Sequence, residues 1–339
     1  MRLYAAPPLP VGDRYNTCGN GSETMASILS PQAYGHNEVS MSEQEGYLSI
    51  ENGLQLYYHT LGDGPIAVLI PAASCLLEDL RPLAKGRKLV FYDQRGRGKS
   101  DRDPDPGHIW TDYEVRDMEA VRQQLGLEQV DLLGWSYLGG IIALYAAQHL
   151  ERVQRMVMMC PVSPRSPAPY DDPEAAEQKE QSRIDPAEAA HLRELMASGK
   201  HISDAEGFCR EFQRVIVPRQ MGRPDGLARM KSDPCAYPNE WWHNLHEHHE
   251  IHFPPDTRSN YDLRDQASRV TAPTLVIHGT EDLIPLESSK EWVDTLPDAR
   301  LFVIEGSGHF PHLESPDIYF PTVDQFLKGK WPGDTIEPL

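Results

Sequence analysis

Three features that would point to membranes, secretion or nucleic acids are missing from this chain of 339 residues. It has no run of eighteen apolar residues, so we expect no membrane-spanning helix, and its start has no apolar segment of the length that a secretory signal needs. Positive charge is scarce: the chain has 32 Lys and Arg residues but 51 Asp and Glu residues, which gives a net charge of −19. This acidic balance argues against nucleic acids and anionic membranes as partners.

Cysteine is also sparse. The five cysteines are odd in number and include no Cys-x-x-Cys pair; they are Cys18, Cys75, Cys160, Cys209 and Cys235. This usage predicts no disulfide framework and indicates a reducing compartment. Together with the missing signal segment, it leads us to expect a cytoplasmic protein.

The first part of the chain differs in composition from the rest. Residues 1–44 are rich in Pro, Gly, Ser and Asn and have no sustained apolar periodicity. We therefore interpret them as a poorly ordered N-terminal extension. An alternative is that the physiological start is Met25 or Met41.

Apolar runs alternate with helical segments from about residue 45 onward. A hairpin comes first, because Asn52-Gly53 separates two strand-like runs and both residues tolerate the positive φ of a tight turn. Parallel strands and helices are then predicted in alternation, with strands at 66–70, 88–92, 129–133, 153–159, 274–278 and 300–304, and helices near 76–84, 112–125, 138–149, 286–295 and 315–328. This order predicts an α/β fold with a doubly wound, mostly parallel sheet and helices on both faces.

The alternation stops after the fourth of these parallel strands. Residues 161–265 carry charged, alanine-rich and helical stretches instead, including one at 241–252, so we interpret them as an inserted helical cap, or lid. The core then consists of residues 45–160 and 266–339. A cap of this kind closes the cleft, excludes water and selects the substrate. The alternative is a covering layer without a role in selectivity.

A serine lies at a strand–turn–helix junction in this pattern. A predicted strand ends at the turn of residues 134–137, with Ser136 at its tip, and a predicted helix follows. Such a turn, the nucleophile elbow G-x-S-x-G, lifts the hydroxyl clear of the sheet and aims helix N–H groups at a developing oxyanion. Here Leu138 replaces the last glycine, and Gly139 and Gly140 are expected to provide the room. Taken alone, the stretch is also consistent with a helix start that happens to contain serine.

An aspartate and a histidine follow the last two predicted strands. Asp282 comes just past the first of them, and His309 lies in a glycine-rich loop directly after the second. A carboxylate that orients a histidine, which in turn takes a proton from serine, forms a catalytic triad. We therefore predict Ser136, Asp282 and His309 as nucleophile, acid and base. His312 lies close by in sequence but falls where the next helix begins, so His309 is preferred.

These motifs resemble the α/β-hydrolase superfamily, and within it the proline iminopeptidase-like branch of serine peptidases and esterases. The order Ser136…Asp282…His309 is the order of that superfamily, and the segment D-Q-R-G-R-G-K-S-D at 93–101 is similar to the strand-and-loop signature of the branch. The resemblance covers about residues 47–331. It implies acyl-enzyme chemistry without a metal or an organic cofactor, and it gives residues 93–101 a structural role beneath the active site.

The expected oxyanion hole departs from that resemblance. These families usually carry His-Gly-Gly-Pro-Gly after the first long parallel strand, whereas this chain has Pro-Ala-Ala-Ser-Cys at 71–75. An oxyanion hole needs only backbone N–H groups, and proline has none. We therefore predict that Ala73 and Tyr137, the residue after the nucleophile, hold the oxyanion.

Two further groups of residues have alternative interpretations. Trp135, Trp241 and Trp242 are candidate substrate-binding residues, but the two cap tryptophans are equally consistent with packing of the cap. Histidines crowd into one stretch of the cap, at His243, His246, His248, His249 and His252. His248 and His252 are a helical turn apart and could share a metal. No patterned carboxylate or cysteine accompanies them, so we interpret the stretch as solvated surface without a metal.

The sequence therefore predicts a serine hydrolase that acts on a small ester, lactone or amide. The missing His-Gly-Gly motif favours an esterase or lactonase over the alternative, an aminopeptidase whose cap carboxylates converge on a free amine. A second alternative is a non-hydrolytic biosynthetic enzyme or ligand receptor that keeps the triad. Epoxide hydrolases and haloalkane dehalogenases are disfavoured, because they need aspartate at position 136. The expected partner is a small-molecule substrate, and the oligomeric state stays open, with a homodimer as one option.

Overall fold

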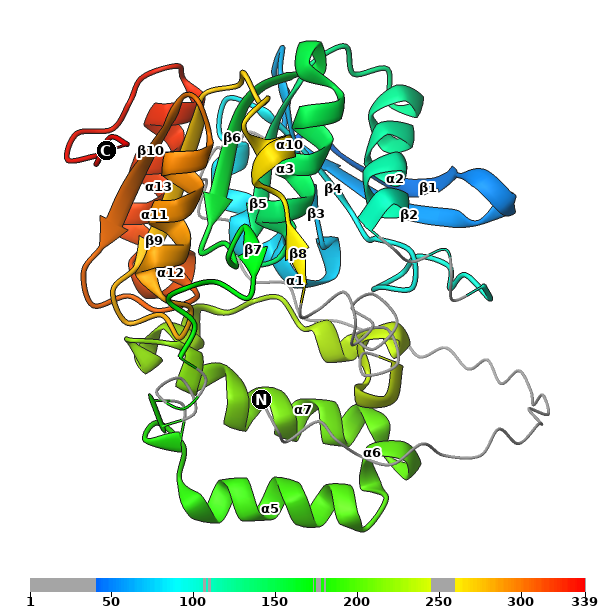
Figure 1. The fold of residues 1–339 in the computed structure, drawn as a ribbon. Coiled ribbons are helices and arrows are strands. Elements are labelled where there is room, and N and C mark those ends of the chain that lie inside the picture. The colour runs from blue at the N-terminus through cyan, green and yellow to red at the C-terminus, as the bar shows by residue number, and fades with distance from the viewer. Residues whose placement is uncertain are drawn as a thin grey trace, which may run out of the picture. The chain divides into compact units, whose positions relative to one another are not determined.

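An eight-stranded, mostly parallel sheet forms the centre of the fold (Figure 1). The computed structural model describes residues 41–105, 108, 111–172, 174, 178–179, 181–244 and 260–338. The strands lie in the order β1-β2-β4-β3-β5-β6-β9-β10, with the bounds β1 Glu43–Ser49, β2 Gln55–Leu61, β3 Ala67–Pro71, β4 Lys88–Tyr92, β5 Val130–Trp135, β6 Val153–Met159, β9 Thr274–Gly279 and β10 Ala299–Ile304. β2 pairs antiparallel with β1 and β4, and the other neighbours pair parallel. The predicted fold class is confirmed.

The hairpin at the edge of the sheet forms around the predicted turn. Asn52 and Gly53 have φ values of 63° and 78°, in the left-handed region that these two residue types adopt most readily. β1 and β2 then pair in one continuous antiparallel register. β1 begins at Glu43, inside the segment predicted to be an extension, and residues 1–40 lie outside the described residues.

Helices cover both faces of the sheet, because each strand directs alternate side chains to opposite faces. Val68 and Ile70 of β3 belong to one buried cluster with side chains of α1 and α13, whereas Leu69 between them belongs to another with side chains of α2, α3 and α11. The described helices of the core are η1 Glu51–Gly53, α1 Ala73–Leu80, η2 Arg81–Ala84, α2 Thr111–Gln124, α3 Leu138–Gln148, η4 Leu150–Arg152, α11 Leu286–Thr295, α12 Pro311–Glu314 and α13 Pro316–Leu327, and α10 Arg264–Ala267 lies at the boundary between cap and core. None of the described helices combines the length and the apolar character that crossing a membrane requires.

Helices outside the sheet fill the segment between β6 and β9 (Figure 1), and we keep the name cap for residues 161–265. A two-stranded ladder of β7 Arg165–Ser166 and β8 Tyr261–Asp262 joins the start and the end of this segment. Its described helices are α5 Pro186–Ala197, α6 Lys200–Ser203, α7 Ala205–Ile216, η5 Val217–Gln220, η6 Pro224–Arg229, η7 Pro234–Ala236 and η8 Pro238–Glu240. Most of the helix predicted at 241–252 lies outside the described residues.

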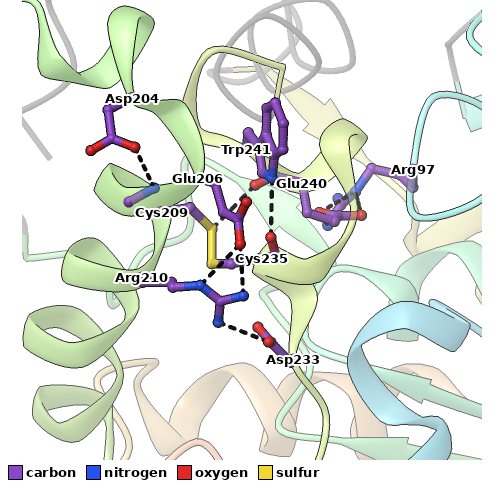
Figure 2. Close-up of a disulfide and its surroundings, with 10 residues drawn as sticks. Arg97, Asp204, Glu206, Cys209, Arg210, Asp233, Cys235, Glu240 and Trp241 are labelled. Carbon is purple, nitrogen blue, oxygen red and sulfur yellow. Dashed lines mark hydrogen bonds and ion pairs between the residues drawn. A yellow bond between two sulfur atoms is a disulfide. The ribbon is translucent and has the colours of Figure 1, made fainter. Parts of the chain in front are cut away.

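One prediction about cysteine is wrong, because Cys209 and Cys235 form a disulfide (Figure 2). The two residues lie 26 positions apart, in α7 and η7, and their Cα atoms are 5.7 Å apart. An odd cysteine count does not exclude a single pair, and only the fold of the cap brings this one together. Cys75 and Cys160 are free. The cysteine argument for a cytoplasmic location loses its basis, and that location stays a prediction.

Candidate active site

Ser136 lies in a sharp turn between β5 and α3. Its φ is 58°, a left-handed conformation that non-glycine residues rarely adopt and that surrounding contacts must hold. Hydrogen bonds fix the backbone on both sides, since Ser136 N–H donates to Met159 O at 2.9 Å and Ser136 O accepts from Gly139 N–H at 3.1 Å. Ser136 itself is half-buried. This is the strand–turn–helix geometry of a nucleophile elbow.

Leu138 does not disturb this turn. It is the first residue of α3, and its side chain is buried in the cluster between the sheet and that helix. The positions without room for a side chain are the nearby glycines. A Cβ on Gly134 would lie 2.6 Å from Leu138 O, and a Cβ on Gly139 would lie 2.9 Å from Pro161 Cβ. Gly139 thus supplies the room that the last glycine of the elbow pattern usually provides.

Asp282 and His309 are joined by a hydrogen bond. The distance between Asp282 Oδ2 and His309 Nδ1 is 2.9 Å, and both side chains are buried. Asp282 Oδ1 accepts from Ile284 N–H at 3.0 Å, which fixes the carboxylate in the loop after β9. Burial raises the pKa of Asp282, but the charge and hydrogen bond of His309 outweigh burial and lower this pKa below its usual value. The arrangement therefore keeps the carboxylate ionised and the imidazole oriented.

The loop that carries His309 is anchored against the elbow. Trp135 Nε1–H donates to His309 O at 2.9 Å, and the two ring centroids are 5.1 Å apart. On the other side, the Glu314 carboxylate accepts from the N–H groups of the residues that flank His309, at 2.9 to 3.0 Å. Because Trp135 directly precedes Ser136, these contacts bring the elbow and the His309 loop to the same edge of the sheet. Sequence reasoning missed Glu314, whose partners are backbone groups.

Cap residues also contact the loops of the acid and the base, which the sequence pattern did not indicate. Lys179 Nζ donates to Asp282 O at 2.7 Å, and Arg183 donates to the carbonyl oxygen of Glu281 at 2.7 Å. His309 N–H donates to Gln220 O in η5 at 2.9 Å. The cap therefore rests directly on the two loops that hold the acid–base pair.

His312 lies inside α12. It is 2% exposed, and its ring centroid is 6.0 Å from that of Tyr319. Burial, together with the charge of His309, lowers the pKa of His312 to about 3. The ring is therefore neutral and shielded from solvent at ordinary pH, which favours His309 as the base.

Both residues predicted for the oxyanion hole stand where a helix begins. Ala73 is the first residue of α1 and follows Ala72, whose φ is 68°, so its N–H is one of the free N–H groups of a helix N-terminus. Tyr137 is the N-cap of α3, and its hydroxyl contacts the side chains of Gln94 and Glu114. Burial raises the pKa of Tyr137 well above its usual value, so this phenol stays neutral. The oxyanion role of both residues stays a prediction.

Both cap tryptophans contact other residues of the cap. Trp242 is buried, with its ring centroid 5.3 Å from that of Phe208 and 4.7 Å from that of Phe212. Trp241 Nε1–H donates to Cys235 O at 3.0 Å. These contacts match the packing alternative for both residues, and their part in substrate binding stays a prediction.

One group among the described residues has the spacing of metal ligands, namely Cys160, Asp282 and His309, whose ligand atoms lie within 4.8 Å of one another. All three are buried, and Asp282 and His309 already bind each other. Burial raises the pKa of Cys160 well above its usual value, and a protonated thiol is a poor metal ligand. We interpret the group as the surroundings of the acid–base pair. Of the clustered cap histidines, His243 is described and the other four lie outside the described residues.

Known proteins resemble this chain in sequence and in fold. A family model described as alpha/beta hydrolase fold matches residues 73–316. Proline iminopeptidase of Heyndrickxia coagulans is 27% identical over 84% of this chain and 99% of its own length. 2-Hydroxymuconate semialdehyde hydrolase of Pseudomonas sp. (strain CF600) is 28% identical over 72% of this chain and 78% of its own. Among solved structures, bromoperoxidase from Bacillus anthracis has a TM-score of 0.61 at 22% identity, covering 84% of this chain and 100% of that one, a likeness of fold alone.

Proposed function

Because this chain belongs to the alpha/beta hydrolase fold family, we propose that it is a serine hydrolase that cleaves a small ester, lactone or amide through Ser136, His309 and Asp282. The observation that carries the proposal is the buried hydrogen bond between Asp282 and His309, in a loop anchored beside the elbow. The relatives named as a peptidase and as a hydrolase support hydrolysis as the reaction class.

Each of these side chains has a defined step in the reaction. His309 Nε2 takes the proton of Ser136 as Oγ attacks the substrate carbonyl. Asp282, bonded to Nδ1, sets the tautomer that leaves Nε2 free to accept, and it stabilises the charged ring. The N–H groups of Ala73 and Tyr137 hold the oxyanion of the tetrahedral intermediate. His309 then protonates the leaving group, and water activated by the same ring clears the acyl-enzyme.

Two observations bear on the choice between an ester and a peptide substrate. Relatives named proline iminopeptidase align with more than four-fifths of this chain, which supports an aminopeptidase. That activity needs a carboxylate that is free to bind the substrate amine. Glu240, the buried carboxylate among the described residues of the cap, is instead paired with Arg97 at 2.7 Å. Together with the altered oxyanion loop, this pairing favours an ester or lactone of a small molecule.

A substrate panel tests the proposal, with p-nitrophenyl esters, lactones and N-terminal proline amides run on the wild type and on Ser136→Ala. We expect steady turnover of an ester or lactone by the wild type, a fall in kcat of about 10⁴-fold in the variant, and labelling of Ser136 by a fluorophosphonate probe. Preference for proline amides would favour the aminopeptidase. A single slow burst without turnover would favour a ligand receptor that keeps the triad. Labelling of another serine, or full activity of the variant, would contradict the triad.

A further inference from the structure

Glu240 is a cap carboxylate buried among residues of the core. It is the last residue of η8 and is 2% exposed. Arg97 contacts both carboxylate oxygens, with Nε 2.8 Å from Oε1 and Nη2 2.7 Å from Oε2, and Figure 2 shows the two side chains facing each other. Gly98 N–H donates to Oε1 at 2.9 Å. A buried charge needs such pairing and hydrogen bonding, and both of these partners belong to the loop at 93–101.

The same loop is tied to the first turn of α1. Asp93, which is also buried, accepts from Ser74 N–H at 2.7 Å and from Lys99 N–H at 3.0 Å. Gly98 is pressed against this carboxylate, since a Cβ on it would lie 2.1 Å from Asp93 Oδ2. Ser74 Oγ–H donates to Glu240 Oε1 at 3.4 Å, the longest of these contacts. Two buried carboxylates, one from the core and one from the cap, therefore meet at Ser74.

Ser74 directly follows Ala73, the residue whose N–H is assigned to the oxyanion hole. The hydrogen bond from Ser74 N–H to Asp93 fixes the Ala73–Ser74 peptide. It thereby restrains Ala73 and the adjoining Ala72–Ala73 peptide, which carries the Ala73 N–H. This part of the chain needs such contacts, because it contains no glycine between 71 and 75 and places Ala72 at a φ of 68°. Left-handed backbone at a non-glycine residue persists only where the surrounding structure holds it.

We propose that Glu240 is a positioning residue for the oxyanion hole. From the cap, its carboxylate binds Ser74, Arg97 and Gly98 and thereby fixes the N–H group of Ala73. This inference rests on the proposed serine-hydrolase function. It means that the oxyanion hole is complete only when the cap is seated on the core, so that the cap contributes to the rate of the chemical step as well as to substrate access.

The disulfide supports Glu240 in this place (Figure 2). Cys235 lies five residues before Glu240, and its carbonyl oxygen accepts from Trp241 Nε1–H at 3.0 Å. Cys209 Sγ lies 3.6 Å from Glu240 O. The backbone around Glu240 is therefore tied to α7, and a side chain presented from a rigid element holds its target more accurately than one on a free loop.

Glu240→Ala and Glu240→Gln test this role, with Glu188→Gln as a matched control that removes the exposed cap ion pair to Arg214. Active sites are counted by titration with a fluorophosphonate, and kcat and KM are then measured with p-nitrophenyl butyrate. We expect kcat per active site to fall about 100-fold in Glu240→Ala with KM within about threefold, because loss of one oxyanion donor costs about 10²–10³ in kcat. Glu240→Gln, whose amide oxygen still accepts from Gly98 N–H, should recover about tenfold of this loss. Glu188→Gln should match the wild type.

A second readout reports on the oxyanion hole itself. Phenylboronic acid forms a tetrahedral anion on an active serine, so its inhibition constant should rise in parallel with the fall in kcat, as transition-state binding requires. A purely structural role of Glu240 would lower the melting temperature and the titrated fraction of active sites. If kcat per active site and the boronate inhibition constant stay at the wild-type values in Glu240→Ala, the proposal is overturned.

Removal of Glu240 alone leaves Arg97 as a buried, unpaired charge, which destabilises strongly. If Glu240→Ala does not fold, the double variant Arg97→Met/Glu240→Leu decides, because it removes both charges. We expect this variant to fold and to lose about 100-fold in kcat per active site, since Gly98 and Ser74 lose their acceptor. Full activity of the double variant overturns the proposal. Failure of the proposed function looks different, because the wild type itself would then show neither labelling at Ser136 nor turnover.

Discussion

The raised pKa of Glu114, which lies beside the candidate oxyanion residue Tyr137, can be tested by measuring the free energy of unfolding. Glu114 lies buried on α2, and its Oε1 accepts from Gln94 Nε2 at 2.9 Å and from the Tyr137 hydroxyl at 3.4 Å. Burial, opposed by the hydrogen bond from Gln94, raises the pKa of Glu114 from 4.5 to about 7. We therefore expect Glu114→Gln, which keeps the acceptor oxygen and removes the charge, to stabilise the protein at neutral and alkaline pH.

The size and the sign of this effect follow from the linkage between proton binding and folding. The Glu114 carboxyl ionises near pH 4.5 in the unfolded chain but keeps its proton to about pH 7 in the folded protein, so the wild type loses stability as the pH rises through that interval. The difference between the two pKa values corresponds to roughly 3 kcal/mol of unfolding free energy. The advantage of Glu114→Gln should be absent below the lower value and should reach roughly 3 kcal/mol above the higher one.

Urea unfolding followed by tryptophan fluorescence from about pH 4.5 to about pH 8.5 measures this difference. Glu119→Gln, on the same helix, is the control of opposite sign, because the hydrogen bond from Arg122 lowers the pKa of Glu119 to about 2. Glu119 is therefore ionised in the folded protein over the whole range, and its variant should be less stable than the wild type by a nearly constant amount. If the wild-type and Glu114→Gln stabilities run parallel across the range, burial does not hold the proton on Glu114 and the reasoning is refuted.

The remaining predictions concern the base, the disulfide and the cap. His309→Ala should lose most activity toward an ester substrate, whereas His312→Ala should keep much of it at a lower melting temperature; equal loss of kcat in both would leave the base unassigned. Cys235→Ser opens a link across 26 residues and should lower the unfolding free energy by about 3 kcal/mol, which an unchanged urea midpoint would contradict. Trp242→Ala should slow hydrolysis of p-nitrophenyl esters of every chain length alike, because the ring packs inside the cap; a loss confined to long acyl chains would assign it to substrate binding.

The elbow could be predicted because all of its determinants lie within a few residues. The buried strand β5, the turn at Ser136 and the helix α3 follow one another directly, and the strand and the helix each have a visible apolar pattern. The turn at Asn52-Gly53 is local in the same sense. The effect of Leu138 could also be predicted, because the glycine that compensates for it is the next residue, Gly139.

The supports of the acid–base pair could not be predicted, because each joins residues that are far apart in sequence. Trp135 bonds to the backbone of His309 across 174 residues, and Lys179 bonds to that of Asp282 across 103. Every residue has a backbone carbonyl, so the sequence does not indicate which carbonyl will accept a hydrogen bond from a given side chain. The disulfide could not be predicted for the same reason. Its two cysteines meet only because the cap helices pack together, and the sequence pattern does not show how these helices pack.

The pairing of Arg97 with Glu240 could not be predicted, although the sequence does show that the loop at 71–75 needs outside contacts. The two residues are 143 positions apart, and nothing near either one indicates the other. The requirement lies in the loop at 71–75, which turns without glycine and places Ala72 in the left-handed region, so that contacts from elsewhere have to hold it. Ser74 receives those contacts from a core carboxylate and from Glu240. The missing glycines and the buried cap carboxylate are thus linked, because the cap supplies the constraint that the loop's own sequence lacks.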